Sequence, residues 1–422
     1  MPAKRRPQST CPARRASATF VTSVTTTQTD ETPTRTIALL AVAAFASAAN
    51  LRICDPLLPQ IAGQLNVTVG SAAGMVTAFA VAYGLSQVAV GPIGDARGKL
   101  PMVVLGSLLT GLATMLCAAM PTLGSLMVAR FVAGACAAAV IPLALAWMGD
   151  VIPYERRQPI LARFLSGQIL GVVFGQAAGG LLGDWIGWRG AMLLLGAVHV
   201  AAGVLLVVDL RHGPYLRIAS GRTRWGEALA SAIDILRRPW VRVVLITVFL
   251  EGVVMFGAFA YIGAELHHRF DLSFAAIGAL LASFGAGAMV YSLSAGWIIA
   301  RLGQRGLARW GALLLAAGYV ALAATPWLWL VALAIAVMGL GFYMLHNTLQ
   351  TNGTQMAPDS RGLAISMFAI SLFIGQSVGV SLAAPVMDRF GGRPIFLLTA
   401  AAIVAIAFWF RRQLIAREQA GG

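Results

Sequence analysis

Residues 101–149 read PMVVLGSLLTGLATMLCAAMPTLGSLMVARFVAGACAAAVIPLALAWMG, and Arg130 is the single charged residue among them. Pro121 and Thr122 divide this stretch into two apolar runs, 101–120 and 123–149. A helix rises about 1.5 Å per residue, so each run is long enough to cross about 30 Å of hydrocarbon. We therefore expect two transmembrane helices here, joined by a short turn.

The same pattern extends over most of the chain. Ten further apolar stretches are long enough to span a bilayer, and they are not the ten-residue alternations of barrel strands. The sequence therefore predicts an all-α membrane protein with twelve transmembrane helices. The other expected spans are 36–60, 71–93, 160–183, 189–209, 240–264, 274–299, 307–325, 327–351, 362–386 and 392–411.

The composition agrees with a membrane location. Hydrophobic residues make up 58% of the 422 residues and charged residues only 11%, against about 25% in a soluble domain. Such a chain has too little polar surface for water, and it is too apolar for a disordered protein. The net charge of +15 is spread over short loops, which argues against a nucleic-acid partner. Three of the four cysteines lie within apolar runs, so no disulfide framework is implied.

The basic residues orient the bundle. Most Lys and Arg side chains lie in the terminal tails and in the loops on the side of both termini, whereas the opposite loops carry only Arg189, Arg269, Arg389 and Arg393. Positive loops stay in the cytoplasm. We expect a multi-pass protein of the cell (inner) membrane with both termini cytoplasmic.

Two segments outside the helices divide the chain. Residues 1–35 form a basic tail rich in Ser and Thr, which we expect to be disordered, and residues 413–422 form a short tail at the other end. In the loop 210–239, apolar residues recur at helical spacing and predict an amphipathic helix at the membrane surface. This linker separates two halves of six helices, 36–209 and 240–412. The apolar positions are Trp225, Leu229, Ile233 and Leu236.

The two halves repeat each other in sequence. Glycine, proline and charged positions match at a spacing of 205 residues and, after one deletion, of 204. An even number of helices per repeat makes the halves parallel, and transporters place their substrate between such halves. Matching pairs are Gly91/Gly296, Gly98/Gly303, Gly106/Gly311, Pro121/Pro326, Gly134/Gly339, Arg156/Arg361, Gly171/Gly375, Gly175/Gly379, Asp184/Asp388, Gly187/Gly391 and Arg189/Arg393.

The loop between the second and third helices reads GPIGDARGK over residues 91–99. It resembles the signature loop G-x-x-x-D-x-x-G-[RK] of the major facilitator superfamily, and a degenerate copy follows at 296–304. The resemblance implies a twelve-helix transporter whose cytoplasmic gate is latched by this loop, with Asp150 at the end of helix four as a further member. Glycines permit a tight turn and close helix contact, and Asp95 is expected to pair with Arg97 or to accept from a helix N-terminus. The gate residues are Gly91, Asp95, Arg97, Gly98, Lys99 and Asp150.

Two features qualify this assignment. Ala300 stands where the second loop of the family carries Asp, so the second latch is expected to be weak. A plain basic turn at the cytoplasmic surface is the alternative for the first loop. A phosphate-binding loop is excluded, because Ile93 and Leu100 occupy positions that need Gly and Ser or Thr.

Four charged residues lie well inside the apolar spans, away from the span ends, where a charge is costly and usually functional. Arg130 belongs to an R-x-x-x-G motif in helix four that resembles the motif of proton-coupled superfamily members. Arg52 and Asp55 lie in helix one at a similar depth to Arg130, so the three side chains are candidates to meet, and Pro56 predicts a kink. Glu251 is alone near the middle of helix seven, and hydrocarbon disfavours its charged form, which suits a proton carrier.

Each of these charges has a structural alternative. Arg130 is also explained as a cation tied to carbonyls, and Arg52 with Asp55 as an i,i+3 pair that neutralises itself. Glu251 is also explained as a buried neutral side chain. Polar residues elsewhere in the spans line a cavity or bond between helices. They are Tyr83, Gln87, Gln168, His346, Asn347 and Gln376.

Helix five carries glycines at every fourth position, in a pattern similar to the antiporter motif G-x-x-x-G-P-x-x-G-G of the superfamily. Gln176 replaces the usual proline, and close helix packing explains the glycines equally well. The motif residues are Gly171, Gly175, Gln176, Gly179 and Gly180. A further group, Glu265, His267, His268 and Asp271, is interpreted as a solvated loop rather than a metal site.

These features favour a monomeric secondary transporter that exports a drug-like compound or a metabolite by proton antiport. The resemblance implies protons, a small-molecule substrate and the lipid bilayer as partners, with no cofactor and no metal. The sequence carries no motif for an enzyme reaction or for ATP binding, so we expect no catalysis. Proton-coupled uptake by symport stays open, and a sensor that moves nothing is the alternative from another class.

Overall fold

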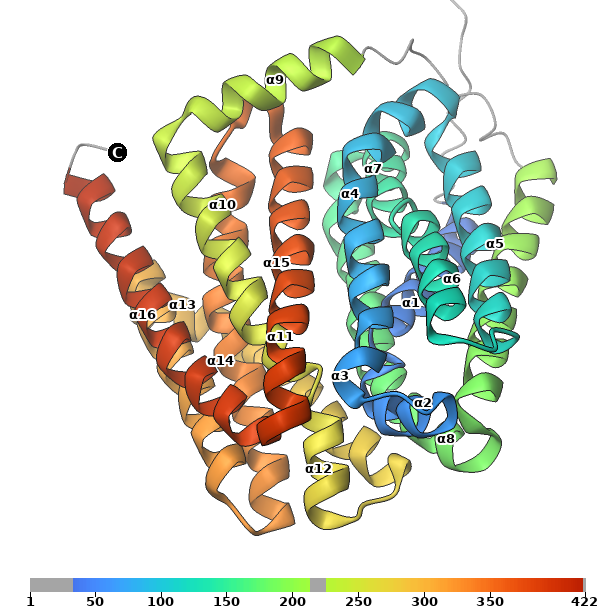
Figure 1. Ribbon diagram of the computed structural model, residues 1–422. Coiled ribbons are helices and arrows are strands. Elements are labelled where there is room, and N and C mark those ends of the chain that lie inside the picture. Colours follow the sequence, from blue (N-terminus) through green and yellow to red (C-terminus); the bar gives the residue numbers. More distant parts are fainter. Residues whose placement is uncertain (1–32, 213–224, 420–422) are drawn as a thin grey trace, which may run out of the picture. The chain divides into compact units, whose positions relative to one another are not determined.

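The computed structural model describes residues 33–212 and 225–419 (Figure 1). The predicted disordered tail 1–35 falls almost wholly outside these residues, as do most of the loop before the predicted amphipathic helix and the last three residues. The first half contains α1 (Thr34–Arg52), η1 (Asp55–Leu57), α2 (Leu58–Leu65), α3 (Val69–Ala72), α4 (Gly74–Arg97), α5 (Lys99–Ala118), α6 (Leu123–Ala137), α7 (Val140–Val151) and α8 (Tyr154–His212). The second contains α9 (Trp225–Arg237), α10 (Pro239–Glu251), η3 (Gly252–Phe256), α11 (Gly257–Phe259), α12 (Ile262–Phe270), α13 (Phe274–Ala324), α14 (Leu328–Gln355), η4 (Pro358–Ser360), α15 (Arg361–Phe390) and α16 (Gly392–Gln419).

The described residues contain the predicted twelve crossings. Ten helical segments are long and apolar enough to cross a membrane. Two of them, α8 and α13, have 59 and 51 residues, and each turns back at a non-helical glycine, Gly187 or Gly303. Each of these two segments therefore supplies two crossings. The described part of the chain has no strand, so the predicted all-α membrane fold is confirmed.

The backbone repeats at its turns. Six described residues have positive φ, and they form three pairs at the spacing of the sequence repeat. Gly98 and Gly303 have φ of 92° and 58°, and Gly187 and Gly391 have φ of 71° and 75°. The third pair, Asn66 and Asp271, have φ of 52° and 51° and end α2 and α12. Because residues other than Gly, Asn and Asp rarely adopt these angles, the repeated glycines mark the places where the chain reverses.

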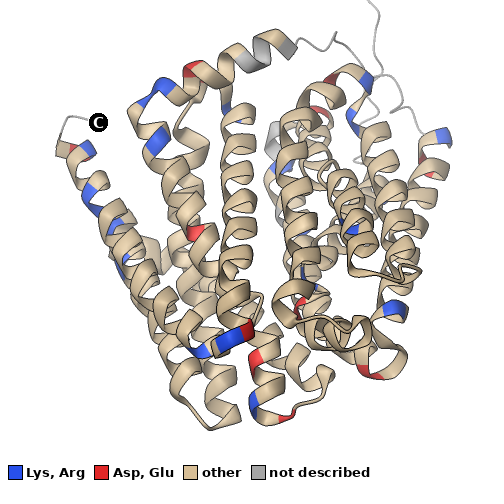
Figure 2. Ribbon diagram, in the orientation of Figure 1, with Lys and Arg blue, Asp and Glu red and all other residues tan. Residues whose placement is uncertain are grey.

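The two ends of the helical bundle differ in which elements they carry. One end, here called the α9 end, holds α9, the start of α1 and the end of α16 (Figure 1). The opposite end, here called the α3 end, holds α2, α3 and α12. Charged residues gather toward the two ends of the helices (Figure 2). The positive-charge argument predicts that the α9 end faces the cytoplasm.

Glycines let the helices approach closely within each half. A Cβ on Gly171 would lie 2.3 Å from the carbonyl oxygen of Phe45 in α1, and one on Gly375 would lie 2.1 Å from that of Phe249 in α10. These two glycines are repeat partners, so the same helix contact is built twice. Gly171 of the helix-five motif thus packs α8 against α1, as the packing interpretation requires.

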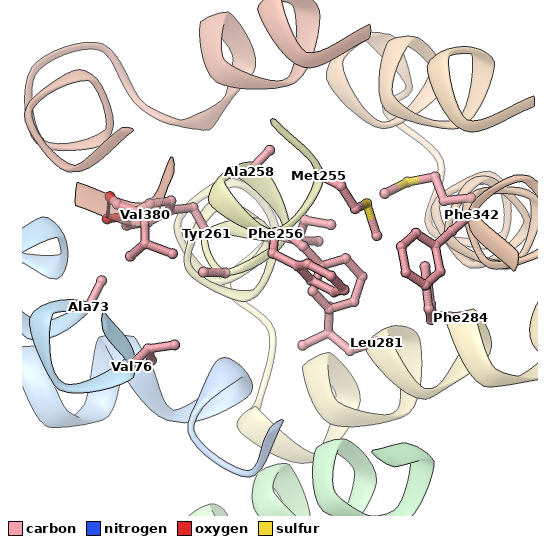
Figure 3. Close-up of a cluster of buried hydrophobic side chains, with 14 of the residues drawn as sticks. Ala73, Val76, Met255, Phe256, Ala258, Tyr261, Leu281, Phe284, Phe342 and Val380 are labelled. Atoms are coloured by element: carbon pink, nitrogen blue, oxygen red, sulfur yellow. Dashed lines mark hydrogen bonds between the residues drawn. The ribbon is translucent and has the colours of Figure 1, made fainter. Parts of the chain in front are cut away.

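A large apolar cluster lies among the helices of the second half and reaches the first. Figure 3 shows Phe256, Phe284 and Phe342 close together, with Ala73 and Val76 of the first half facing Val380. The Tyr261 hydroxyl donates to the Val380 carbonyl at 2.8 Å. Tyr261 is wholly buried, and this bond satisfies its polar atom.

Helix α9 occupies the region predicted to be amphipathic. Ile235 is buried, while Ile233 and Leu236 are 48% and 43% exposed. This arrangement fits a helix that packs one side on the bundle and turns apolar side chains toward lipid. Only Arg238 separates α9 from α10, so α9 is joined directly to the second half.

One predicted loop is helical instead. The sequence predicts that the seventh span ends at residue 264 and that a solvated loop follows it, with Glu265, His267, His268 and Asp271. In the structure, α12 instead continues to Phe270. Glu265 is only 6% exposed, because its carboxylate accepts the backbone N–H of Gly392 at 2.8 Å. Asp271 ends the helix in the left-handed conformation. The prediction of a solvated loop is therefore wrong for Glu265.

Candidate functional site

The four intramembrane charges are all buried. Asp55 and Glu251 are 0% exposed, Arg130 is 1% exposed and Arg52 is 9% exposed. The structure divides them among three local groups instead of one cluster. Buried charges persist only where partners stabilise them, and each group has its own set of partners.

Arg130 of α6 is bound to helix α1 through Asn50. Its Nη1 donates to the Asn50 side-chain oxygen at 2.6 Å, and its Nη2 donates to the Asn50 carbonyl at 3.1 Å. The Asn50 amide donates in turn to Thr114 Oγ1 at 2.7 Å. The guanidinium lies 4.2 Å from the ring centroid of Phe79, a favourable cation–π distance. Arg130 is thus held by neutral groups, and the expected contact with Asp55 is not formed.

Asp55 lies where helix α1 breaks. The helix ends at Arg52, and Asp55 begins the short 3-10 turn that contains Pro56, so the kink predicted from the proline is present. Arg52 Nη1 is 3.6 Å from Asp55 Oδ2. This distance is too long for a hydrogen bond, and neither carboxylate oxygen has a hydrogen-bond partner. The side chain of Gln176 in α8 adjoins the same carboxylate.

The Arg52–Asp55 pair faces the second half. The Arg52 guanidinium lies 4.3 Å from the ring centroid of Phe256 and 5.6 Å from that of Phe259. A Cβ on Gly263 in α12 would lie 2.9 Å from the Asp55 carbonyl oxygen. The ion pair of the first half therefore lies against α11, α12 and η3 of the second.

Glu251 has a partner that the sequence did not indicate. Its Oε2 is 2.8 Å from Nδ1 of His346, which lies 95 residues away in α14, and Oε1 has no partner. The His346 side chain is 14% exposed, whereas Glu251 is fully enclosed. The sequence shows His346 only as one of several polar residues within spans. No spacing rule links residues in the seventh and tenth crossings, so only the fold brings them together.

Aromatic rings connect the Arg52–Asp55 pair with the Glu251–His346 pair. The Phe256 ring lies against the Arg52 guanidinium, and the centroid of this ring is 5.4 Å from that of Phe342. Phe342 then stacks on the His346 ring at 4.8 Å. Arg52 of the first half and His346 beside Glu251 are therefore joined through two phenylalanines (the first ring contact is visible in Figure 3). Aromatic pairs at these separations contribute a favourable interaction energy in addition to the free energy gained by burying their apolar surface.

The chain between these pairs contains an unusual turn. Residues Gly252–Phe256 form a π-helix directly after Glu251, a feature found frequently at functional sites. The wider turn frees carbonyl groups, and other helices satisfy two of them. Tyr319 donates its hydroxyl to the Met255 carbonyl at 2.8 Å, and Thr399 donates to that of Val254 at 3.4 Å.

The loop at the α9 end forms a charged group around Lys99. Lys99 Nζ contacts Asp150 Oδ2 and is 3.7 Å from Asp95 Oδ1. The expected pairing of Asp95 with Arg97 is wrong, because Lys99 is the partner and Arg97 points to the surface. Asp150 is a member of the group, as predicted. All of these residues belong to the first half.

The glycines of this loop have different roles. Gly98 needs its positive φ, whereas a Cβ on Gly91 would meet nothing within 4 Å. The expected close contact at Gly91 is therefore absent. In the second half, Asn352 donates to Gln304 Oε1 at 3.0 Å, and Gln304 is the repeat partner of Lys99. A hydrogen bond between two neutral side chains therefore takes the place of the charged group. This agrees with the presence of Ala300 where the second loop of the family carries Asp.

Gln176 contributes more than helix packing. It is 1% exposed, its side-chain oxygen lacks a partner, and its amide adjoins Asp55. Gly175 and Gly179 pack on the chain of the first crossing: a Cβ on Gly175 would lie 2.7 Å from the Ala49 carbonyl oxygen, and one on Gly179 would lie 2.5 Å from that of Ile53. The glycines bring α8 close to α1, and Gln176 lies beside the Asp55 carboxylate without a hydrogen bond between them. Over the described residues, no group of His, Cys, Asp and Glu is arranged to hold a metal ion.

The fold and the buried polar groups between two six-helix halves are those of a membrane transporter. The model of the Major Facilitator Superfamily matches residues 40–380, and the chain belongs to that family. It is 28% identical over 380 residues to a chloramphenicol resistance protein of Streptomyces lividans, covering 88% of this chain and 95% of the relative. It is 28% identical to the puromycin resistance protein pur8 of Streptomyces alboniger, covering 77% of this chain and 76% of that protein.

Solved structures show the same fold. A nucleoside transporter, NupG, superposes with a TM-score of 0.75 at 13% identity, covering 89% of this chain and 98% of that one. A bacterial homologue of the human lysosomal transporter Spinster, in an inward-facing and unoccupied conformation, superposes with a TM-score of 0.74 at 16% identity, covering 91% and 98%. At these identities the likeness concerns the fold alone.

Proposed function

We propose that this transporter exports a small organic molecule, a drug-like compound or a metabolite, in exchange for protons by alternating access. It acts as a monomer in the inner membrane, with both termini in the cytoplasm. Export is supported by the relatives named for chloramphenicol and puromycin resistance and by the helix-five motif. Proton coupling is supported by the buried carboxylates.

The observation that carries the proposal is the state of Asp55 and Glu251. Both are fully enclosed, and both have at least one oxygen without a hydrogen-bond partner. An enclosed carboxylate oxygen without a donor is costly, and a bound proton removes the charge. Each carboxylate also contacts a basic side chain, Arg52 or His346, so its charge has a partner when the proton leaves.

The energy available from one proton is sufficient for export. A charge that crosses 100 mV releases about 2.3 kcal/mol. At about 1.4 kcal/mol per tenfold change in concentration, this supports a substrate gradient of about 50-fold. One titrating carboxylate is therefore enough, and two provide for a larger gradient or for separate binding and release steps.

The test uses everted membrane vesicles with an imposed proton gradient and radiolabelled chloramphenicol or puromycin as probes. An exporter accumulates a probe in everted vesicles at the expense of the gradient. A proton carrier changed by Asp55→Asn or Glu251→Gln loses this gradient-driven accumulation yet keeps downhill exchange, because exchange moves no net protons. Glu265→Gln is the control, since Glu265 is also buried but caps a helix.

Other outcomes reject parts of the proposal. Accumulation by both neutral variants against a gradient would show that neither carboxylate couples protons. Co-movement of probe and protons in the same direction would identify a symporter. If a growth screen over many toxic compounds finds no difference with and without the gene, a sensor becomes the better assignment.

A further inference from the structure

Two acidic residues at the α3 end are repeat partners that the proposed function does not use. Asp184 lies in α8, near the end of the fifth crossing, and Asp388 lies near the end of α15. They match at the 204-residue spacing of the repeat. Among the described residues, no hydrogen bond or ion pair joins either carboxylate to the buried pairs, yet each bonds to residues in the opposite half of the protein.

Asp184 caps the beginning of a helix in the second half. Its Oδ1 accepts the backbone N–H of Phe274 at 3.1 Å, and its Oδ2 accepts that of Ala275 at 2.8 Å. These are the first two residues of α13. The first N–H groups of a helix have no partner within the helix and carry partial positive charge, so a carboxylate stabilises them.

Asp388 does the same in the reverse direction. Its Oδ1 accepts the backbone N–H of Gly70 at 2.8 Å, and its Oδ2 accepts the Thr68 hydroxyl at 2.7 Å. Gly70 is the second residue of the crossing segment Val69–Arg97 in the first half. Each half therefore supplies a carboxylate to the start of a crossing in the other half.

Small residues next to both contacts bring the halves together. A Cβ on Gly70 would lie 2.7 Å from the carbonyl oxygen of Ala384, and one on Gly180 would lie 2.0 Å from that of Phe274. Gly180 and Ala384 are repeat partners. The same close approach is thus built twice, and Gly180 of the antiporter-like motif belongs to this contact rather than to the packing of α8 on α1.

We propose that Asp184 and Asp388 are the two clamps that hold the α3 end closed during the transport cycle. Alternating access requires this end to open, and opening separates the end of the fifth crossing from the start of α13. All four hydrogen bonds must then break. The clamps set how often the α3 end opens, which the predicted orientation places outside. This inference concerns the conformational cycle and does not depend on proton coupling or on the direction of transport.

The test measures the distance across the α3 end in the purified full-length chain. Spin labels are attached at Gly124→Cys and Leu328→Cys, exposed positions in the first turns of α6 and α14, one in each half. Cys11 and Cys136 are replaced by alanine, while Cys54 and Cys117 are buried and stay. Pulsed electron paramagnetic resonance then measures the distribution of distances between the two labels, and this distribution gives the fractions of closed and open molecules.

Asp184→Asn or Asp388→Asn should each raise the ratio of open to closed molecules about fivefold, the effect expected for one weakened helix cap. The double variant should raise it about 25-fold if the two clamps act independently. The matched control is Glu265→Gln, which weakens a cap within the second half alone. It should leave the distances unchanged.

Two results would overturn the proposal. One is an unchanged distance distribution in the double variant with an unchanged unfolding temperature. The other is an equal shift in Glu265→Gln, which would make the effect one of general loosening. Should the double variant fail to fold, the single variants decide, since each keeps one clamp.

Discussion

Arg130 is a buried cation whose two side-chain hydrogen bonds both end on Asn50, a neutral residue. Its position in helix four was predictable from the sequence, because one Arg in a long apolar run is conspicuous. Its partner was not. The sequence predicts a similar depth for Arg130, Arg52 and Asp55, but side chains at a similar depth in a bundle can point in different directions. The break in α1 after Arg52 turns Asp55 toward α8 and the second half.

We predict that Arg130→Lys impairs transport more than folding. Lysine keeps the charge but lacks the planar fork that reaches both the side chain and the carbonyl of Asn50. Losing one charged hydrogen bond costs about 1.5–3 kcal/mol. Vesicle transport should fall at least tenfold while the purified protein still shows a cooperative thermal transition. Arg156→Lys, at an exposed position, should match the unchanged protein, and equal activity of the two variants would contradict the prediction.

We predict that His346→Gln reproduces the effect of Glu251→Gln. Glutamine retains a hydrogen-bonding side chain but cannot hold a proton as imidazole does. Gradient-driven accumulation of the probes should be lost and downhill exchange retained. His268→Gln, on the exposed surface of α12, should change neither measurement. Unaltered gradient-driven transport in His346→Gln would leave the histidine with a packing role only.

At the scale of helices, most of the fold was predictable and the exceptions have physical causes. Hydrophobic length defines a crossing well, and the repeated glycines locate the turns. The predicted end of the seventh crossing is wrong, because a Glu at this point of the sequence is typical of a surface loop. In the structure, the Glu265 carboxylate is buried and accepts the backbone N–H of Gly392 at the start of α16. The π-helix of Gly252–Phe256 has no apolar signature, since it depends on Tyr319 and Thr399 of distant helices.

The contact between α8 and α1 gives a test within one motif. A Cβ on Gly171 would collide with the Phe45 carbonyl at 2.3 Å, whereas one on Gly167, a turn away, would lie 3.4 Å from the Ala41 carbonyl. Gly171→Ala should lower the free energy of unfolding by about 1–3 kcal/mol, the usual cost of overpacking. Gly167→Ala should be tolerated, because alanine favours the helix. Thermal unfolding in detergent measures both, and similar melting temperatures would argue against a close contact.

For the molecule as a whole, the sequence repeat anticipated more than the order of helices. It predicted that both halves turn at equivalent residues, and the paired positive φ angles agree. It could not show which repeated residues act across the halves. Asp184 and Asp388 match in sequence just as Gly106 and Gly311 do, and only the assembled structure shows that the carboxylates reach the opposite half while these glycines serve packing within each half.

The orientation of the molecule is open to a direct test. The excess of Lys and Arg at the α9 end predicts that both termini lie in the cytoplasm. A fluorescent protein fused after Gly422 should therefore fold and fluoresce, and alkaline phosphatase fused there should be inactive. Phosphatase inserted after Asn66, in the turn between α2 and α3, should be active. The reverse pattern would invert the assignment of both ends, including that of the proposed clamps.

The π-helix after Glu251 has a consequence for angular register. A π turn holds one residue more than an α turn, so its return to an α-helix would rotate every later side chain in the segment by about 100°. Phe256 and Phe259 would swing away from Arg52, and the ring contact toward His346 would break. A small rearrangement beside Glu251 would thereby remove the aromatic contacts of Arg52, the cation that faces Asp55. Comparing the reactivity of a cysteine at Phe256 in the wild-type and Glu251→Gln backgrounds would record such a rotation, and identical reactivity would count against it.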